Sequence, residues 1–503
     1  MSGALPRRAR RLAGSAVTLV AFTLPVYLFA GLNPSPSYSR EPAPRVALTS
    51  AQLARARAFP MIAGGVPVLT YHDVTDDDGG PRAVSPALLA AHMAILRAAG
   101  FHAIGLRELL AYLEHGASLP PRPVLITFDD GLHTTWSTAD SILEENGFRG
   151  VAFLIAGQIG RHRPYYMNGG EVRDLLGSGR WDVGAHTFLG HGDVAVDDRG
   201  GTGPFLTNRA WLPDAGRLET REEFAARVAR DLDRGTAALE ALGASRPEVF
   251  AYPFAVDDAP ADDPALAGIL RRAVDARYRV SFVDDAGARA AVRPGEGLRE
   301  LPRIAVTSSV TPEGLLDMIQ AAMPVPPRLR GLAPARWVGE RGRPVPTTAF
   351  RGGRLALRTG VGLWDAAYFS PEQTAAWRNY AVSLRVAGLG RGDSGANATL
   401  VMRASERPRD PRVAVTLAAG RVTLQQVATA GSVPVASTVV DERADHRLDV
   451  TIEGDAVAIS VDGRLALRHT VRWSTSGGIG LGAWRARTRS PQPTFSDLVV
   501  ARA

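Results

Sequence analysis

The segment VLITFDDG, residues 124–131, decides the fold of this chain. Its apolar, partly β-branched run lies between Pro123 and Gly131, which predicts a short buried strand. Asp129 and Asp130 stand where this strand ends. Two carboxylates at the mouth of a buried strand cost solvation free energy unless a cation holds them. The segment therefore predicts a strand whose carboxyl end forms part of a cation site.

A second segment, WDVGAHTFLGH at residues 181–191, brings two imidazoles to another strand end. His186 and His191 are five residues apart, so on a helix they would diverge by about 140°. We therefore place them on a strand end and the loop after it, with Gly190 supplying a sharp backbone turn. His186, His191 and Asp130 form a set that holds a divalent metal and leaves coordination positions open to water. Asp129 would then lie beside the metal as a base.

The chain between residues 66 and 325 alternates strand and helix patterns, which argues for a parallel β/α domain. Active-site residues at the carboxyl ends of strands fit a barrel. The predicted strands are 66–71, 124–128, 150–155, 181–186, 249–254, 278–283 and 301–306. The predicted helices are 86–99, 134–146, 171–176, 222–242 and 263–276.

Residues 347–503 show many short strand patterns that follow one another with turn signals between them. This pattern predicts an all-β sandwich domain. Residues 326–346 are rich in Pro, Arg and Gly and predict a linker. The predicted strands of the sandwich are 380–386, 399–403, 413–417, 421–427, 448–452, 457–461 and 495–500.

The N-terminus, residues 1–33, predicts a membrane segment. Arg7, Arg8, Arg10 and Arg11 precede an apolar stretch at 12–32, which is long enough to span a bilayer with a cytoplasmic N-terminus. An uncleaved anchor is favoured, because a cleaved signal peptide has a shorter core and a small-x-small site. In both cases the remainder is exported: anchored at the extracellular face of the membrane, or secreted after cleavage. Residues 34–65 predict a linker.

Composition excludes several classes of protein. The 503 residues contain no Cys, so disulfides and thiolate metal sites are excluded. The formal net charge is +7, and every basic residue is Arg. Beyond the N-terminus these Arg residues are interspersed with Asp and Glu, whereas nucleic-acid binding shows as a basic stripe with aromatics. We therefore expect no nucleic-acid partner, and nothing in the sequence indicates a protein partner.

The motifs TFDD and HT…H resemble those of the polysaccharide deacetylases of carbohydrate esterase family four. The five-residue histidine spacing, LTYHDV at 69–74 and GPFLTNRAWLPDAGRLETREEF at 203–224 resemble the bacterial branch that acts on poly-β-1,6-N-acetylglucosamine. This resemblance covers residues 67–320. In the C-terminal part, LDVTIEGDAVAISVDGR and GGIGLGAW resemble concanavalin-like jelly rolls, which implies a module that binds glycan or packs on the catalytic domain.

The resemblance implies a distorted (β/α) barrel with fewer than eight strands, and a divalent metal, zinc in preference to cobalt or nickel. It makes His72 the general acid that protonates the leaving amine, because the late segment 301–303 carries no histidine. It also implies that the backbone N–H of Phe254 stabilises the oxyanion.

Each assignment has a plainer alternative. Asp129 could be only a structural partner for an arginine, and His72 a satisfied strand-end histidine. Arg303 could orient Asp129 or make only a surface pair. Aromatic residues near the motifs could stack on sugar rings or simply anchor loops. The substrate-binding candidates are Tyr166, Phe205, Trp211 and Arg303.

Taken together, the sequence predicts metal-dependent hydrolysis of N-acetyl groups from an extracellular N-acetylglucosamine-containing polysaccharide. One alternative is a peptidoglycan or chitin-oligomer deacetylase with the same site, which product analysis on defined polymers would distinguish. Another is a non-catalytic glycan-binding surface protein, which acetate release would exclude.

Overall fold

The described part of the chain begins after the expected membrane segment. The computed structural model describes residues 39–60, 64–77, 79–253, 263–285, 291–295, 297–339, 343–390, 395–405, 411–428, 431–471 and 476–503. Within these ranges no helix has both the length and the apolar character needed to cross a membrane. The predicted anchor at residues 1–33 lies outside them.

Seven parallel strands close into a barrel, which confirms the expectation of fewer than eight. The ring runs β1-β12-β11-β10-β5-β4-β3, and β3 pairs back onto β1. The short β2 (His102–Ala103) adds to β3 outside the ring. The seven strands are β1 (Val68–Tyr71), β3 (Pro123–Phe128), β4 (Gly150–Leu154), β5 (Trp181–Ala185), β10 (Val249–Ala251), β11 (Val280–Asp285) and β12 (Leu301–Ala305).

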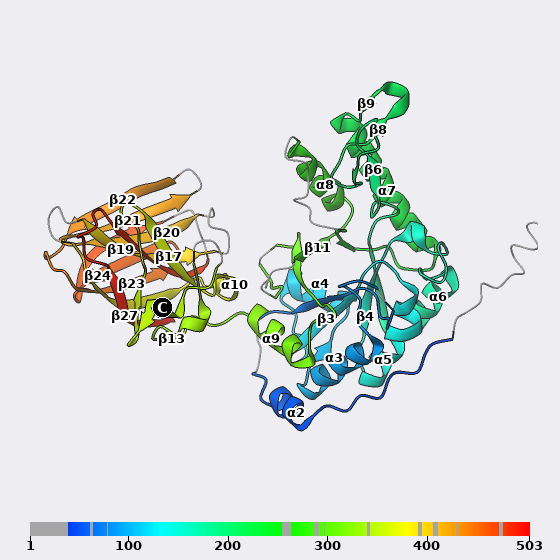
Figure 1. Ribbon diagram of the computed structural model, residues 1–503, viewed down its shortest axis with the longest axis horizontal. Coiled ribbons are helices and arrows are strands. Elements are labelled where there is room, and N and C mark those ends of the chain that lie inside the picture. Colours follow the sequence, from blue (N-terminus) through cyan, green and yellow to red (C-terminus); the bar gives the residue numbers. More distant parts are fainter. Residues whose placement is uncertain are drawn as a thin grey trace, which may run out of the picture.

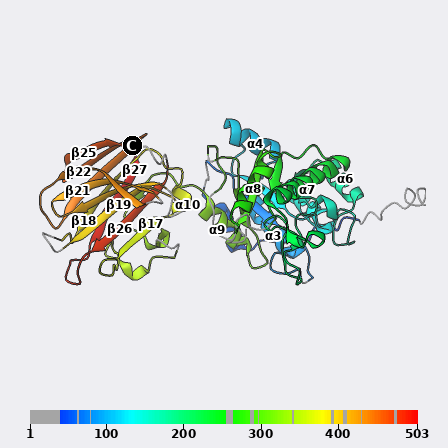
Figure 2. The same ribbon diagram turned by 90° about the horizontal axis from the view of Figure 1, so that it is seen from above.

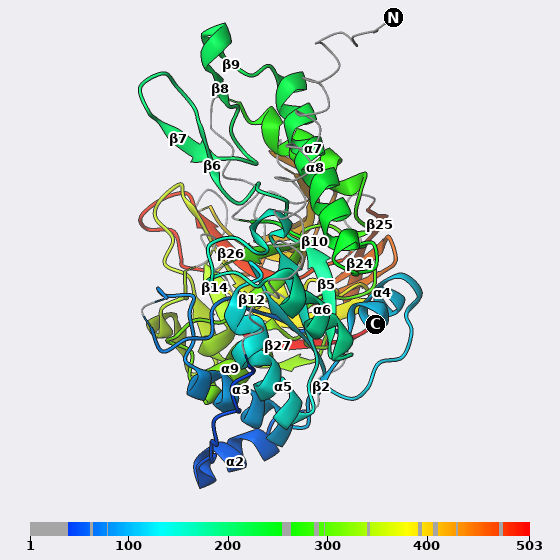
Figure 3. The same cartoon turned by 90° about the vertical axis from the view of Figure 1, so that its right-hand side faces the viewer.

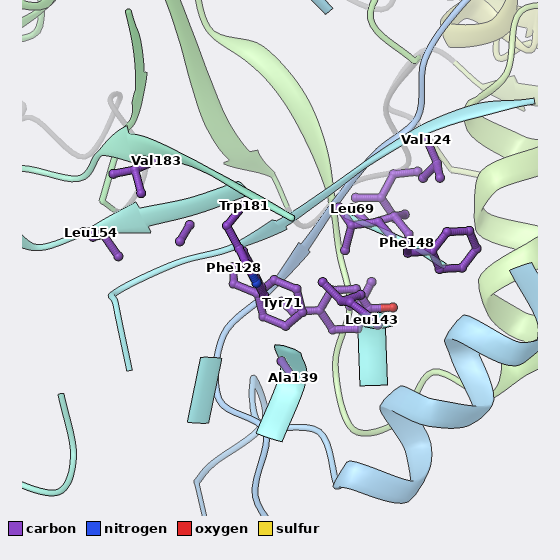
Figure 4. Close-up of a cluster of buried hydrophobic side chains, with 14 of the residues drawn as sticks. Leu69, Tyr71, Val124, Phe128, Ala139, Leu143, Phe148, Leu154, Trp181 and Val183 are labelled. Atoms are coloured by element: carbon purple, nitrogen blue, oxygen red, sulfur yellow. The ribbon is translucent and has the colours of Figure 1, made fainter. Parts of the chain in front are cut away.

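The strands are mostly apolar because both of their faces are covered. All six residues of β3 are buried. Phe128 stacks on Tyr71 of β1 at 5.3 Å between ring centroids and meets the edge of Trp181 from β5. Figure 4 shows these rings between the sheet and the helices outside it. A continuous apolar run is what a parallel strand with helices outside and a filled interior requires.

Helices surround the barrel (Figure 1). Ser85 caps α3 by accepting a hydrogen bond from the Leu88 N–H, with Pro86 in the first turn as predicted. Part of the expected linker at 34–65 is also helical, because Thr49 and Gln52 form a capping box. The helices are α2 (Ser50–Arg57), α3 (Pro86–Ala98), α4 (Leu106–His115), α5 (Asp140–Asn146), α6 (Gly169–Gly177), α7 (Arg221–Ala241), α8 (Ala265–Asp275) and α9 (Pro312–Ala322).

Two small hairpins separate β5 from α7. They form an arm that projects beyond the barrel, alongside α7 (Figures 1 and 3). Since the arm begins directly after the histidine segment, its base lies at the carboxyl end of β5. The hairpins are β6 (Asp193–Ala195) with β7 (Thr202–Pro204), and β8 (Trp211–Leu212) with β9 (Arg217–Leu218).

The C-terminal part is all-β, with two antiparallel sheets around one apolar core. One sheet has eight strands: β13 (Leu329–Arg330), β15 (Phe350–Arg351), β16 (Arg354–Ala356), β27 (Thr494–Arg502), β18 (Tyr380–Ala387), β23 (His446–Glu453), β24 (Ala456–Val461) and β25 (Arg464–Thr470). The other, called here the seven-stranded sheet, contains β14 (Trp337–Gly339), β17 (Trp364–Phe369), β26 (Gly478–Arg485), β19 (Ala396–Ala404), β20 (Arg412–Ala418), β21 (Arg421–Ala428) and β22 (Gly431–Val439).

The stretch 326–346, expected to be a linker, instead contributes strands to both sheets. β13 (Leu329–Arg330) pairs with β27, and β14 pairs with β17. The Trp337 side chain is buried in the core of the C-terminal domain, so apolar anchors within this Pro-rich stretch hold it to the sheets.

The two domains meet at the end of α9 (Figure 2). Gln373, in the short α10 (Pro371–Thr374), donates to the carbonyl oxygens of Gln320 and Met323, each at 2.9 Å. The Trp377 indole N–H donates to the carbonyl of Val325 at 2.7 Å. Trp377 is therefore buried and hydrogen-bonded at this contact.

Candidate active site

The chemically active side chains gather at one end of the barrel. His72 follows β1, Asp129 and Asp130 follow β3, and His186 follows β5. Because these strands are parallel, their carboxyl ends share one rim, which is where (β/α) barrels hold their catalytic groups.

Asp130, His186 and His191 converge at this rim. One ligand atom from each lies within 4.8 Å of the others. Asp130 Oδ1 is 3.5 Å from His186 Nε2 and 3.2 Å from His191 Nε2, and the ring centroids are 5.3 Å apart. The structure thus brings together the three residues that the sequence proposed as metal ligands. We call this set the Asp-His-His triad.

The donor chemistry of the triad fits a cation. His186 Nδ1 lies 2.8 Å from the carbonyl oxygen of Ala251, so this nitrogen carries the proton and Nε2 presents a lone pair. Asp130 Oδ1, which faces that lone pair, is buried and accepts no hydrogen bond from a described residue. Burial raises the pKa of Asp130, whereas hydrogen bonds from protonated His186 and His191 would lower it well below the ordinary value. With both imidazoles neutral, a bound cation would take over that role and keep the carboxylate ionised. An ionised oxygen facing a ring lone pair is repulsive unless a positive ion lies between them.

The backbone at the triad is strained. Asp130 has φ +73° and Thr187 has φ +74°, in the left-handed region that non-glycine residues seldom occupy. Strain of this kind persists only where the surrounding structure enforces it, and it concentrates at functional sites.

Asp231 of α7 fixes the loop between the two histidines. Its carboxylate accepts hydrogen bonds from the backbone N–H groups of Phe188 and Leu189, both at 2.9 Å. A Cβ at Gly190 would lie 3.0 Å from Asp231 Oδ2. Gly190 is therefore needed for close approach to this carboxylate rather than for a left-handed turn. No local pattern marks Asp231 as functional, because it lies in the middle of α7.

Asp129 belongs to a buried ion-pair network. Arg303 donates to both of its oxygens, at 2.8 and 2.7 Å, and lies 2.8 Å from Asp284 Oδ1. The Arg303 side chain is 0% exposed. The predicted direct role of Arg303 in substrate binding is therefore wrong, and its alternative role of orienting Asp129 is the one that the geometry supports. Although burial raises the pKa of Asp129, the Arg303 charge lowers it below the ordinary value.

Asp284 was missed by sequence reasoning. The signal was present, because the strand predicted at 278–283 is followed by an Asp-Asp pair, as the strand at 124–128 is. The prediction ended two residues too early, since β11 continues to Asp285.

His72 lies next to this network. Its Nε2 is 3.8 Å from Asp284 Oδ2 and 2.9 Å from Nη1 of Arg82, a half-exposed residue. Burial lowers the pKa of His72, and the charges of Asp129, Asp130 and Asp284 raise it only in part. Because Arg82 only donates, His72 Nε2 acts as an acceptor in this arrangement.

The aromatic candidates divide by position. Tyr166 lies in the loop beside Asp130, where burial and then the Asp130 charge raise its pKa to about 12. Tyr165, 53% exposed, packs edge-on against Tyr166 at 4.9 Å between centroids. Phe205 lies under the Arg227 guanidinium at 4.1 Å, and Trp211 stands on the β8–β9 hairpin. Contact of these side chains with substrate remains a prediction.

Phe254, whose backbone N–H was expected to stabilise the oxyanion, lies outside the described residues. His133, to which no role was assigned from the sequence, has its Nδ1 2.9 Å from Glu171 Oε1. Its backbone N–H donates to the carbonyl oxygen of Tyr165 at 2.8 Å.

Comparison with known proteins finds similarity to polysaccharide deacetylases within the first domain. The polysaccharide deacetylase family profile matches residues 116–265. The poly-β-1,6-N-acetyl-D-glucosamine N-deacetylase of Escherichia coli K12 is 24% identical over 205 residues, which is 38% of this chain and 30% of that protein. The chain thus spans about a third of the length of the curated relatives it matches.

Two solved structures are also similar. A de-N-acetylase from Aggregatibacter actinomycetemcomitans is 18% identical, with a TM-score of 0.44, over 50% of this chain and 99% of that one. IcaB from Ammonifex degensii is 28% identical, with a TM-score of 0.39, over 52% of this chain and 98% of that one.

Proposed function

Because residues 116–265 carry a polysaccharide deacetylase domain, we propose that this chain hydrolyses N-acetyl groups on an N-acetylglucosamine-containing polysaccharide outside the cell. The observation that carries the proposal is the Asp-His-His triad beside the Arg303-oriented Asp129, at the carboxyl rim of a closed barrel. The relatives named for poly-β-1,6-N-acetylglucosamine support that polymer as the substrate.

Asp130, His186 and His191 would hold the metal, zinc being preferred. A divalent cation at this position would polarise the amide carbonyl and acidify water. Asp129 takes the proton from the water as its oxygen attacks the carbonyl carbon. Since Arg303 lowers the pKa of Asp129, this carboxylate is a weak base, and it therefore depends on water that is already acidified.

Breakdown releases acetate and a free amine. His72 delivers a proton to the amide nitrogen as the carbon–nitrogen bond breaks. For this step Nε2 must carry a proton, so the Arg82 guanidinium, now 2.9 Å away, has to yield that position to the substrate.

The flanking parts of the chain support an extracellular setting. The Arg cluster at residues 7–11 and the apolar stretch at 12–32 support export with retention at the membrane. The strings at 448–464 and 477–484 support a concanavalin-like jelly roll for the C-terminal sandwich. Membrane fractionation of the full chain, with and without residues 1–33, tests the anchoring.

Metal analysis and acetate release test the catalytic proposal together. We expect about one divalent ion per purified chain, and chelation should remove both the ion and the activity on poly-β-1,6-N-acetylglucosamine. Activity that survives complete removal of metal would contradict the mechanism. Activity on chitin oligomers or peptidoglycan but not on this polymer would reassign the substrate.

Replacing His72 by Ala should lower turnover by about 10²-fold or more without loss of metal, because general acids contribute at this scale. Acetate release and metal content are measured on the same preparation. His115→Ala, at a side chain 76% exposed, is the matched control and should behave as wild type. A near wild-type rate for the His72 variant would move the acid role to another residue, His133 first.

A further inference from the structure

The side chains of the seven-stranded sheet divide into two faces. On β17, Ala367 and Phe369 point into the core of the sandwich. Successive residues of a strand point to opposite faces, so Trp364, Ala366 and Tyr368 lie on the outer face. Trp364 keeps 37% of its surface exposed, whereas Tyr368 is buried.

Glycines on the neighbouring strand β26 make room for these rings. A Cβ at Gly482 would lie 2.2 Å from Trp364 Cη2, and one at Gly480 would lie 2.6 Å from Tyr368 Cδ1. The rings therefore lie directly against the β26 backbone. The Trp364 indole rests on the sheet on one side and still meets solvent, which is the arrangement of a stacking platform.

A row of hydroxyl groups continues from this platform across the sheet. Strand register places the residues directly opposite one another on the outer face, beginning at Gly482 and continuing through Thr399, Thr416, Thr423 and Ser437. Thr399 and Thr416 share a hydrogen bond of 2.9 Å between their hydroxyls, and Thr416 donates to Gln425 Oε1 at 2.9 Å. Thr399 is buried, so the members of the row that a ligand can reach are Thr416, Thr423 and Ser437. The members of the row are themselves uncharged, which suits a neutral polar ligand, and at its far end the Arg421 guanidinium donates to the Ser437 hydroxyl at 3.3 Å.

Exposed apolar side chains gather beside the platform. Among the described residues, three of the seven large hydrophobic side chains that are exposed lie within four positions: Val361 at 46%, Leu363 at 63% and Trp364 at 37%. Trp484, the cross-strand partner of Trp364, adjoins them. A concentration of exposed apolar surface rimmed by polar groups is typical of a binding site.

We propose that this outer face binds a neutral glycan chain, with one pyranose ring stacked on Trp364 and the following sugars along the hydroxyl row. The choice of an N-acetylhexosamine polymer as the glycan rests on the proposed function. Such a chain offers apolar C–H faces to an indole and hydroxyl and amide groups to Thr and Gln side chains. The C-terminal domain would then hold the polymer while the barrel deacetylates it.

Binding of the full chain to insoluble poly-N-acetylglucosamine tests the proposal. Trp364→Ala should weaken binding about tenfold or more, equivalent to about 1.4 kcal/mol, and Trp364→Phe should retain most of it. Leu465→Ala, at a side chain 61% exposed on β25 of the other sheet, is the matched control and should bind as wild type. Deacetylation of short soluble oligomers should be unchanged in all three variants.

Two further measurements avoid dependence on a single variant. Gly482→Ala should weaken binding as Trp364→Ala does, because its Cβ displaces the indole. In the wild-type chain with chelator present, a β-1,6-linked N-acetylglucosamine hexamer should protect Trp364 from oxidation by N-bromosuccinimide, read by peptide mass spectrometry. Unchanged binding in folded Trp364 and Gly482 variants, or oxidation of Trp364 at the same rate with and without the hexamer, would overturn the proposal.

The outcomes separate this inference from the proposed function. If the chain releases no acetate but loses glycan binding on Trp364→Ala, the deacetylase proposal fails and this one stands. If acetate is released and binding is indifferent to Trp364, the catalytic proposal stands, and this face is left without a glycan-binding role.

Discussion

Replacing Asp129 by Asn is expected to reduce acetate release by about 10²–10⁴-fold while the metal stays bound. The amide cannot take a proton from water, but it keeps the shape of the carboxylate and one oxygen that can still accept a hydrogen bond from Arg303. Both acetate release and metal content are to be measured on the same purified sample.

The matched variant is Asp130→Asn, one position along. Its backbone has φ +73°, a conformation that Asn tolerates better than other residues, so the local fold should survive. A neutral amide is a poor metal ligand, and this variant should lose metal and activity together. If instead Asp129→Asn loses the metal and Asp130→Asn retains it, the roles of base and ligand are reversed.

The barrel was predictable from sequence because each of its strands is a local pattern. The apolar runs around Val124 and Trp181 end in residues that are costly to bury, which marks the strand and its functional end together. Two helices within residues 66–325 were nevertheless missed, besides α2 in the expected linker. α4 begins after Gly105, which has no side chain to cap it, so the local signal was weak. α9 has a Thr311 cap and Pro312 in its first turn. The sequence therefore contained a start signal for this helix, which the prediction overlooked.

The ion-pair network was not predictable in the same way. Arg303 and Asp129 lie on β12 and at the end of β3, and both strands pair with β1. Only closure of the ring brings the two residues together, from 174 positions apart in the chain. Arginine is also among the residue types least often buried, so nothing local indicated that this side chain would be fully enclosed.

The aromatic residues of the sandwich show the same limit. Trp337, Trp364 and Trp377 read alike in the sequence, yet Trp337 and Trp377 are buried while Trp364 is not. Which face of a strand a residue occupies depends on register, because a shift of one position exchanges the two faces. The predicted strands included neither β14 nor β17, and Trp337 lay in the expected linker, so the sequence could not indicate which tryptophan would meet solvent.

Arg303→Gln is expected to destabilise the barrel strongly. The side chain is fully buried between Asp129 and Asp284, and burial alone would favour its neutral form, yet the two carboxylates raise its pKa above the ordinary value. Removing it leaves two carboxylates without their cation, and breaking a buried pair in this way costs about 3–5 kcal/mol. For a domain of this size the melting temperature should fall by about 6–20 °C.

Urea unfolding of the metal-free chain at several pH values checks the cause as well as the size of this loss. In the wild type the pKa of Asp129 is lowered on folding, so its contribution to stability is present above the unfolded pKa and is lost as the pH falls through the folded value. In the variant, buried carboxylates without a cation have raised pKa values, so protonation relieves them. The difference in unfolding free energy should therefore be largest near neutral pH and should narrow on acidification.

Arg279→Gln is the control, because its guanidinium pairs with Glu114 and Glu248 at the surface and is 48% exposed. Exposed pairs contribute about 0–1 kcal/mol. If the unfolding free energy fell by the same small amount in both variants, Arg303 would not be the cation on which the site depends. A large loss that does not narrow with falling pH would point to a packing defect, and the electrostatic account of Asp129 would then be wrong.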